Sequence, residues 1–170
     1  KEFGMTSVAV TDHGNLFGAI EFYEEARRQG VKPILGCEVY VALQSRLDRK
    51  KENIKQTPNH LILLAENFEG WQNLCKLSSL GYIEGFYYKP RVDKEVLRQF
   101  HKGLIATSAC LKGEISRSFA AGKREEARAT TLEFVEIFGE GNFFIEVQLN
   151  GAPGQVEVNQ CLVELAKEVG

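Results

Sequence analysis

The chain has 170 residues, of which 44% are hydrophobic and 26% charged, so it is long enough to bury the core of one domain. Its formal net charge of -2 excludes the broad basic field of a domain that binds nucleic acid with its whole surface. No apolar run is long enough to span a bilayer and no secretory signal is present, so we expect no membrane contact and a cytoplasmic location.

The four cysteines, Cys37, Cys75, Cys110 and Cys161, are far apart in the sequence and form no CxxC pair, which disfavours a zinc ribbon. In a chain without a secretory signal we expect them to be reduced thiols. The chain begins at Lys1, and its last residues are still helical in pattern. We therefore expect an internal fragment of a longer protein.

The first half of the chain predicts strands that alternate with helices. Buried strands are predicted by the apolar runs at Ser7–Thr11, Pro33–Ala42 and Leu61–Ala65. Asn15 is placed to cap a helix over Leu16–Gln29, which Gly30 would end. The polar segment Gln44–Pro58 predicts a mobile loop, and Glu69–Gly81 predicts a second helix.

The second half continues this alternation after an aromatic, irregular connection at Tyr82–Val92. Strands are expected at Gly103–Ser108 and Asn142–Gln148, and helices at Asp93–Phe100, Gly113–Ala121, Lys123–Phe138 and Gln155–Val169. Apolar strands that alternate with amphipathic helices are typical of an α/β fold with parallel strands. In a (β/α) barrel of this kind the chemistry lies at the carboxyl ends of the strands.

The first predicted strand ends in the sequence TDHGN at residues 11–15, which places a carboxylate and an imidazole at its carboxyl end. Such a pair suits a divalent cation, because imidazole and carboxylate are its common protein ligands. Alternatively, Asp12 caps a turn and His13 is an ordinary loop histidine. The two residues alone leave both interpretations open.

Three further side chains lie near the ends of other predicted strands. Glu38 interrupts an apolar run, where a carboxylate is costly unless it binds a metal, forms a salt bridge or faces outward. Cys110 follows the fourth strand, either as a thiolate ligand or as a small buried hydrophobe. His60 precedes the third strand, so either this strand is reversed or the loop before it folds over the barrel mouth. The convergence of His13, Glu38 and Cys110 predicts a metal site.

At these residues the sequence resembles the polymerase and histidinol phosphatase (PHP) domain of bacterial DNA polymerase III alpha subunits. The resemblance is carried by VAVTDHGNLFGAIEFYEEA at 8–26, GVKPILGCEVYVA at 30–42, the segment 59–97, KGLIATSACLKGEI at 102–115 and FFIEVQLNG at 143–151. The stretch from His60 through GWQNL to KPR at 89–91 points to the replicative polymerase more than to free-standing phosphatases.

The resemblance implies a distorted (β/α) barrel of the PHP metal-dependent hydrolase type, present as a single domain over residues 1–170 and lacking its first and last strands. It implies divalent metal ions (zinc, manganese or magnesium) held by His13, Glu38, His60 and Cys110. Asp12 would be a further ligand or a supporting residue, and Asp12 with His13 would serve catalysis. The implied activity is 3′-5′ exonuclease proofreading by phosphodiester hydrolysis, within a DNA-directed DNA polymerase.

The aromatic connection adds a candidate DNA contact, because Tyr87 and Tyr88 are interleaved with Lys89 and Arg91. Packing against a neighbouring polymerase domain is the alternative. The expected partners are DNA and other subunits of the polymerase holoenzyme, among them a proofreading subunit and, through other regions, the sliding clamp. Two other functions stay open, a non-catalytic docking module of the polymerase and a free-standing phosphatase.

Overall fold

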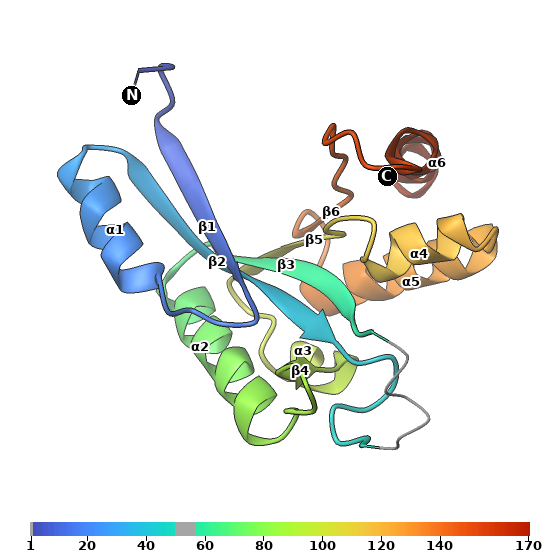
Figure 1. Ribbon diagram of the computed structural model, residues 1–170, viewed down its shortest axis with the longest axis horizontal. Helices are drawn as coiled ribbons and strands as arrows, with labels where there is room; N and C mark the ends of the chain where they lie inside the picture. Colours follow the sequence, from blue (N-terminus) through green and yellow to red (C-terminus); the bar gives the residue numbers. More distant parts are fainter. Residues whose placement is uncertain (1, 50–56) are drawn as a thin grey trace.

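The computed structural model describes residues 2–49 and 57–170, which form a mixed α/β unit (Figure 1). Its elements are β1 (Ser7–His13), α1 (Ala19–Arg28), β2 (Lys32–Val41), β3 (Asn59–Ala65), α2 (Phe68–Ile83), β4 (Arg91–Val92), α3 (Lys94–Gln99), β5 (Leu104–Thr107), α4 (Glu114–Ala120), α5 (Arg124–Phe138), β6 (Phe143–Phe144) and α6 (Gln155–Val169). Within the described ranges, no helix combines the length and apolar character that a bilayer span requires.

In the part of the chain that the structure describes, six strands form one open sheet in the order β1-β2-β3-β5-β6, with β4 paired to β2. Figure 1 shows α1 at the β1 end of this sheet and α4, α5 and α6 gathered at the β6 end. The prediction of an α/β fold is therefore confirmed. Among the described residues the sheet does not close into a barrel.

The general expectation of parallel strands does not hold at β3, which runs antiparallel to both β2 and β5. Of the two alternatives that the sequence left open for the strand after His60, the structure shows the reversed one. The pairs β1–β2, β2–β4 and β5–β6 are parallel. Parallel neighbours need a long crossover, usually a helix, and the described residues between β2 and β3 contain none. Because β3 is reversed, its first residues lie beside the end of β2, with His60 opposite Tyr40.

Two element boundaries differ from the prediction because side chains satisfy the backbone locally. The first helix begins at Ala19, not Leu16, because the Asn15 side chain accepts from Phe17 N (3.0 Å) and holds a turn. The last strand pairs only at Phe143–Phe144, and beyond it the backbone N–H of Glu146 donates to a side-chain oxygen instead of a ladder carbonyl.

The two faces of the central strands have different environments. Cys37, Val39, Leu61 and Leu63 are at most 3% exposed and form the core with apolar residues of the helices. Side chains alternate between the faces of a strand. Their neighbours Glu38, His60 and Ile62 therefore share the other face, where they are only partly buried. The sheet thus gives one face to the core and leaves the other available for a site.

Arg46 is an anchor at the start of the segment that the sequence predicts to be mobile; residues 50–56 of that segment lie outside the described residues. Its backbone N–H donates to Asp93 Oδ2 (2.8 Å), and its guanidinium contacts the carboxylates of Asp93, Glu84 and Glu95. The Arg46 side chain is 11% exposed and that of Asp93 only 4%. This ion-pair group fixes the chain after β2 against the start of α3.

We expect Arg46→Ala to lower the free energy of unfolding by about 2–3 kcal/mol, because it leaves the Asp93 carboxylate buried without its charged partner. Chemical denaturation of both proteins measures the difference. The matched control is Arg28→Ala, which removes an arginine from an exposed pair with Glu25 and is expected to change stability little. Equal losses in the two variants would contradict a structural role for the Arg46 group.

Candidate metal centre

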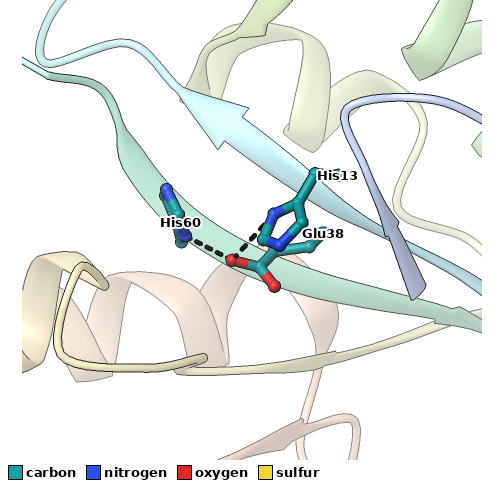
Figure 2. Close-up of side chains that lie close together, drawn as sticks. All are labelled: His13, Glu38 and His60. Atoms are coloured by element: carbon teal, nitrogen blue, oxygen red, sulfur yellow. Dashed lines mark ion pairs between the residues drawn. The ribbon is translucent and has the colours of Figure 1, made fainter. Parts of the chain in front are cut away.

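Three potential metal ligands come from three adjacent strands. His13 is the last residue of β1 and lies directly opposite Glu38 of β2 in the parallel register. In the antiparallel register Glu38 lies opposite Ile62, so His60 is two residues away along β3. Residues in register, and residues two apart on a strand, share a face of the sheet. The side chains of His13, Glu38 and His60 therefore converge, as Figure 2 shows.

The convergence is centred on one carboxylate oxygen. Glu38 Oε1 lies 3.4 Å from His13 Nδ1 and is also in contact with His60 Nδ1 (Figure 2). One ligand atom from each residue lies within 4.8 Å of the others. Glu38 Oε1 is buried and accepts no well-directed hydrogen bond from residues 2–49 or 57–170. A buried oxygen without a hydrogen bond, facing two imidazole nitrogens, fits a divalent cation among these atoms.

The surroundings of Glu38 favour its ionised carboxylate, which is the form that binds a metal. Burial alone would raise the pKa of its carboxyl, but the close contact and charge of His60, with the charges of His13 and Lys112, hold that pKa below its ordinary value. The Tyr40 ring packs edge-on against His60, with centroids 5.3 Å apart, and lies parallel to His13 at 6.4 Å. Tyr40 therefore packs against the His60 ring and borders the more exposed His13 ring.

Cys110 borders this group. It lies in the turn after β5, and its Sγ is 3.6 Å from His60 Nδ1. The turn is joined to β3, because His60 N donates to Lys112 O (3.0 Å) and Lys112 N donates to Cys110 Sγ (3.4 Å). The structure therefore brings Cys110 beside His60, although its sulfur is outside the close trio. All four cysteines are free thiols.

Asp12 is not brought into the group. It precedes His13 on β1, so its side chain points to the opposite face of the sheet. Its Oδ2 accepts from Gly18 N (3.3 Å), at the N-cap of α1. The carboxylate thus supports the turn before the helix, which is the alternative that the sequence left open. Its predicted place as a metal ligand or catalytic group is not supported by this position.

The four candidate DNA contacts differ in their accessibility. Tyr88 is 70% exposed and packs against Tyr87, with ring centroids 4.8 Å apart. Lys89 is also exposed, and its Nζ lies 5.2 Å from the centroid of the Tyr40 ring. Since Tyr40 contacts His60 and lies beside His13, Lys89 stands at the rim of the candidate metal centre.

Arg91, the fourth candidate DNA contact, is buried in this structure. The residue is 8% exposed, and its guanidinium donates to the backbone carbonyls of Gly85, Arg46 and Asp48. A guanidinium that is buried and engaged by three carbonyls is not available to a phosphate. Its role in this structure is to hold two chain segments against β4.

Sequence reasoning missed two features of this face. Tyr40 is two residues beyond Glu38, and the period of a strand could have placed it beside the site. Thr107 and Glu146, which are hydrogen-bonded to each other, also lie near the turn that carries Cys110. No sequence signal joins these two residues, because they are 39 positions apart.

Comparison with known proteins identifies the family. A model described as "PHP domain" matches residues 1–150. Proteins named DNA polymerase III subunit alpha are 46% identical over 170 residues in Borreliella burgdorferi, 50% over 165 in Thermus aquaticus and 45% over 170 in Treponema pallidum. These matches cover 100%, 96% and 100% of this chain, but the chain spans only 15%, 13% and 14% of the respective relatives. The chain belongs to the PHP domain family.

Proposed function

We propose that this chain is the metal-dependent phosphoesterase domain of a bacterial DNA polymerase III alpha subunit, and that it removes nucleotides from DNA 3′ ends. The observation that carries the proposal is the buried Glu38 oxygen, which faces two imidazole nitrogens and has no hydrogen-bond partner among the described residues. The name shared by the relatives supports the polymerase as the parent protein. A cytoplasmic location and a distorted (β/α) barrel, of which this open sheet would be part, belong to the same proposal.

In this proposal His13, Glu38, His60 and Cys110 hold zinc, manganese or magnesium. The bound metal would lower the pKa of water and stabilise negative charge at the phosphate. The residues of the chain would hold the metal in a fixed place. His60 and Glu38 are fixed by the strands and by Tyr40, whereas the His13 side chain is 62% exposed and marks the side from which a substrate approaches.

Lys89 would hold the DNA backbone beside this centre, and Tyr88 would offer a surface for base stacking. We expect Lys89→Ala to weaken binding of single-stranded DNA and to reduce the slope of log affinity against log salt by about 1. The matched control is Lys102→Ala, which removes an exposed lysine from the turn before β5. Fluorescence anisotropy at several salt concentrations measures both slopes, and an equal decrease in the two variants would contradict a local role for Lys89.

The proposed function is tested first by the metal content of the full-length protein, measured by mass spectrometry beside a His13→Ala, Cys110→Ala double variant. Bound zinc or manganese that falls in the double variant, together with 3′-end nuclease activity that falls with it, is the expected result. Absence of metal from the wild-type protein would overturn the hydrolase proposal. Activity on small phosphate esters but not on DNA would favour a free-standing phosphatase.

One observation favours a second candidate function, a docking module for other polymerase subunits. Phe17, Ile83 and Phe86 are 83%, 78% and 50% exposed, and Tyr82 lies between the rings of Phe17 and Phe86. An exposed group of large apolar side chains is typical of an interaction surface. A metal-free domain that binds another subunit through these residues would be the result that favours this candidate.

A further inference from the structure

A second polar group lies on the same face of the sheet as the candidate metal centre. Glu38 pairs with Ile62, and Ile62 pairs in turn with Thr107 of β5. Residues in register share a face, so the Thr107 side chain points to the same side as Glu38. Its Oγ1 donates to Glu146 Oε2 at 2.5 Å. The metal centre described above does not include this threonine and carboxylate.

The Thr107 hydroxyl also contacts the turn that carries Cys110. A hydroxyl has one proton, and here it is directed to Glu146. The oxygen is then free to accept, and it faces Ala109 N at 3.4 Å. Ala109 has φ 57°, a left-handed conformation that disfavours residues with a β-carbon, and it is only 2% exposed. Such a conformation persists only where its surroundings hold it.

Glu146 is itself held from two sides. Its Oε1 accepts from Gln148 Nε2 (2.7 Å), and Asn159 of α6 donates to Gln148 O (2.7 Å). Its backbone N–H donates to Ser108 Oγ (2.9 Å), and Ser108 N donates to Phe144 O (3.0 Å). The carboxylate therefore has a fixed place relative to the turn after β5.

We propose that Glu146 is a positioning residue for Cys110. Through the Thr107 hydroxyl, its carboxylate holds the left-handed turn at Ala109, and this turn places Cys110 Sγ beside His60. The inference rests on the proposed metal site, because it assigns Glu146 a role in presenting one of that site's ligands. Glu146 does not touch the metal in this scheme and acts only through the turn.

The test compares Thr107→Val, which removes the hydroxyl at nearly constant shape, with Thr107→Ser, which keeps it. Cobalt(II) binding to the full-length protein is followed by the sulfur-to-cobalt charge-transfer absorption, which reports the Cys110 bond. We expect Thr107→Val to weaken cobalt binding roughly 10- to 100-fold and to lose this absorption, as for other residues that orient a metal ligand. Thr107→Ser is expected to stay near the wild type.

Glu146→Ala is expected to weaken cobalt binding as much as Thr107→Val does. The double variant should bind cobalt no more weakly than either single variant, because both substitutions act on the same turn. A second readout needs no metal. In the metal-free protein, the rate of alkylation of Cys110 should change in Thr107→Val and Glu146→Ala, while the rates of Cys75 and Cys161 should not.

Two results separate the inference from the proposed function. A wild-type protein that binds no cobalt would overturn the metal site, and the alkylation rates would still decide whether Glu146 positions Cys110. The positioning role would be overturned if Thr107→Val and Glu146→Ala had the same cobalt spectra and the same Cys110 alkylation rates as the wild type. A loss in Thr107→Ser as large as in Thr107→Val would also overturn it, because the hydroxyl would then be irrelevant.

Discussion

Glu38→Gln is expected to lower the affinity for zinc or manganese by more than ~100-fold and to remove any nuclease activity that depends on the metal. Loss of a residue that only orients a ligand costs about 10- to 100-fold, so loss of the central charged ligand should exceed that range. Glutamine has nearly the same shape as glutamate, so the main change is the loss of negative charge between His13 and His60. The low pKa of Glu38 means that this charge is present at neutral pH.

Isothermal titration with zinc measures the affinity, and thermal unfolding without metal checks the fold. The matched control is Glu66→Gln, an exposed glutamate just after β3, which should bind metal as the wild type does. Unchanged zinc affinity in Glu38→Gln would contradict the assignment of Glu38 as a ligand. An equal loss in Glu66→Gln would show that general surface charge, not the three-strand group, attracts the ion.

Most of the fold could be predicted from local patterns. The apolar runs and helical spacing placed the central strands and the long helices close to their observed bounds, because burial of these side chains decides both the pattern and the element. The direction of β3 could not be predicted in this way. It depends on how the chain returns from β2. An apolar run such as Leu61–Ala65 has the same pattern whether its strand pairs parallel or antiparallel to the next.

The candidate site, like the fold, was predictable from the sequence only in part. His13, Glu38 and His60 were identified as single residues of the right chemistry, and strand register then brought them together. Asp12 and Arg91 had equally suitable chemistry, but their surroundings use them elsewhere. The alternation of β1 turns Asp12 toward Gly18, and burial commits Arg91 to backbone carbonyls. Residue type was therefore sufficient to nominate candidates, whereas the face of the strand and burial selected among them.

Two glycines of α2 have different surroundings, and their alanine variants are expected to have opposite effects on stability. A β-carbon added at Gly70 would lie 1.8 Å from the carbonyl oxygen of Gly103, a backbone atom that cannot move alone. Gly70→Ala is expected to cost about 3 kcal/mol. At Gly81 the nearest atom would be at 3.4 Å, an ordinary contact, so Gly81→Ala should stabilise the helix by about 0.5–1 kcal/mol.

Chemical and thermal unfolding of both variants measures these changes. For a chain of this size, Gly70→Ala should lower Tm by about 6–12 °C. The close contact also has a consequence for the site, because Gly103 directly precedes β5, and β5 leads to Cys110. Displacement of α2 from Gly103 should therefore loosen the turn that holds the thiol and speed alkylation of Cys110. A Gly70→Ala protein as stable as Gly81→Ala would show that α2 is not seated against Gly103.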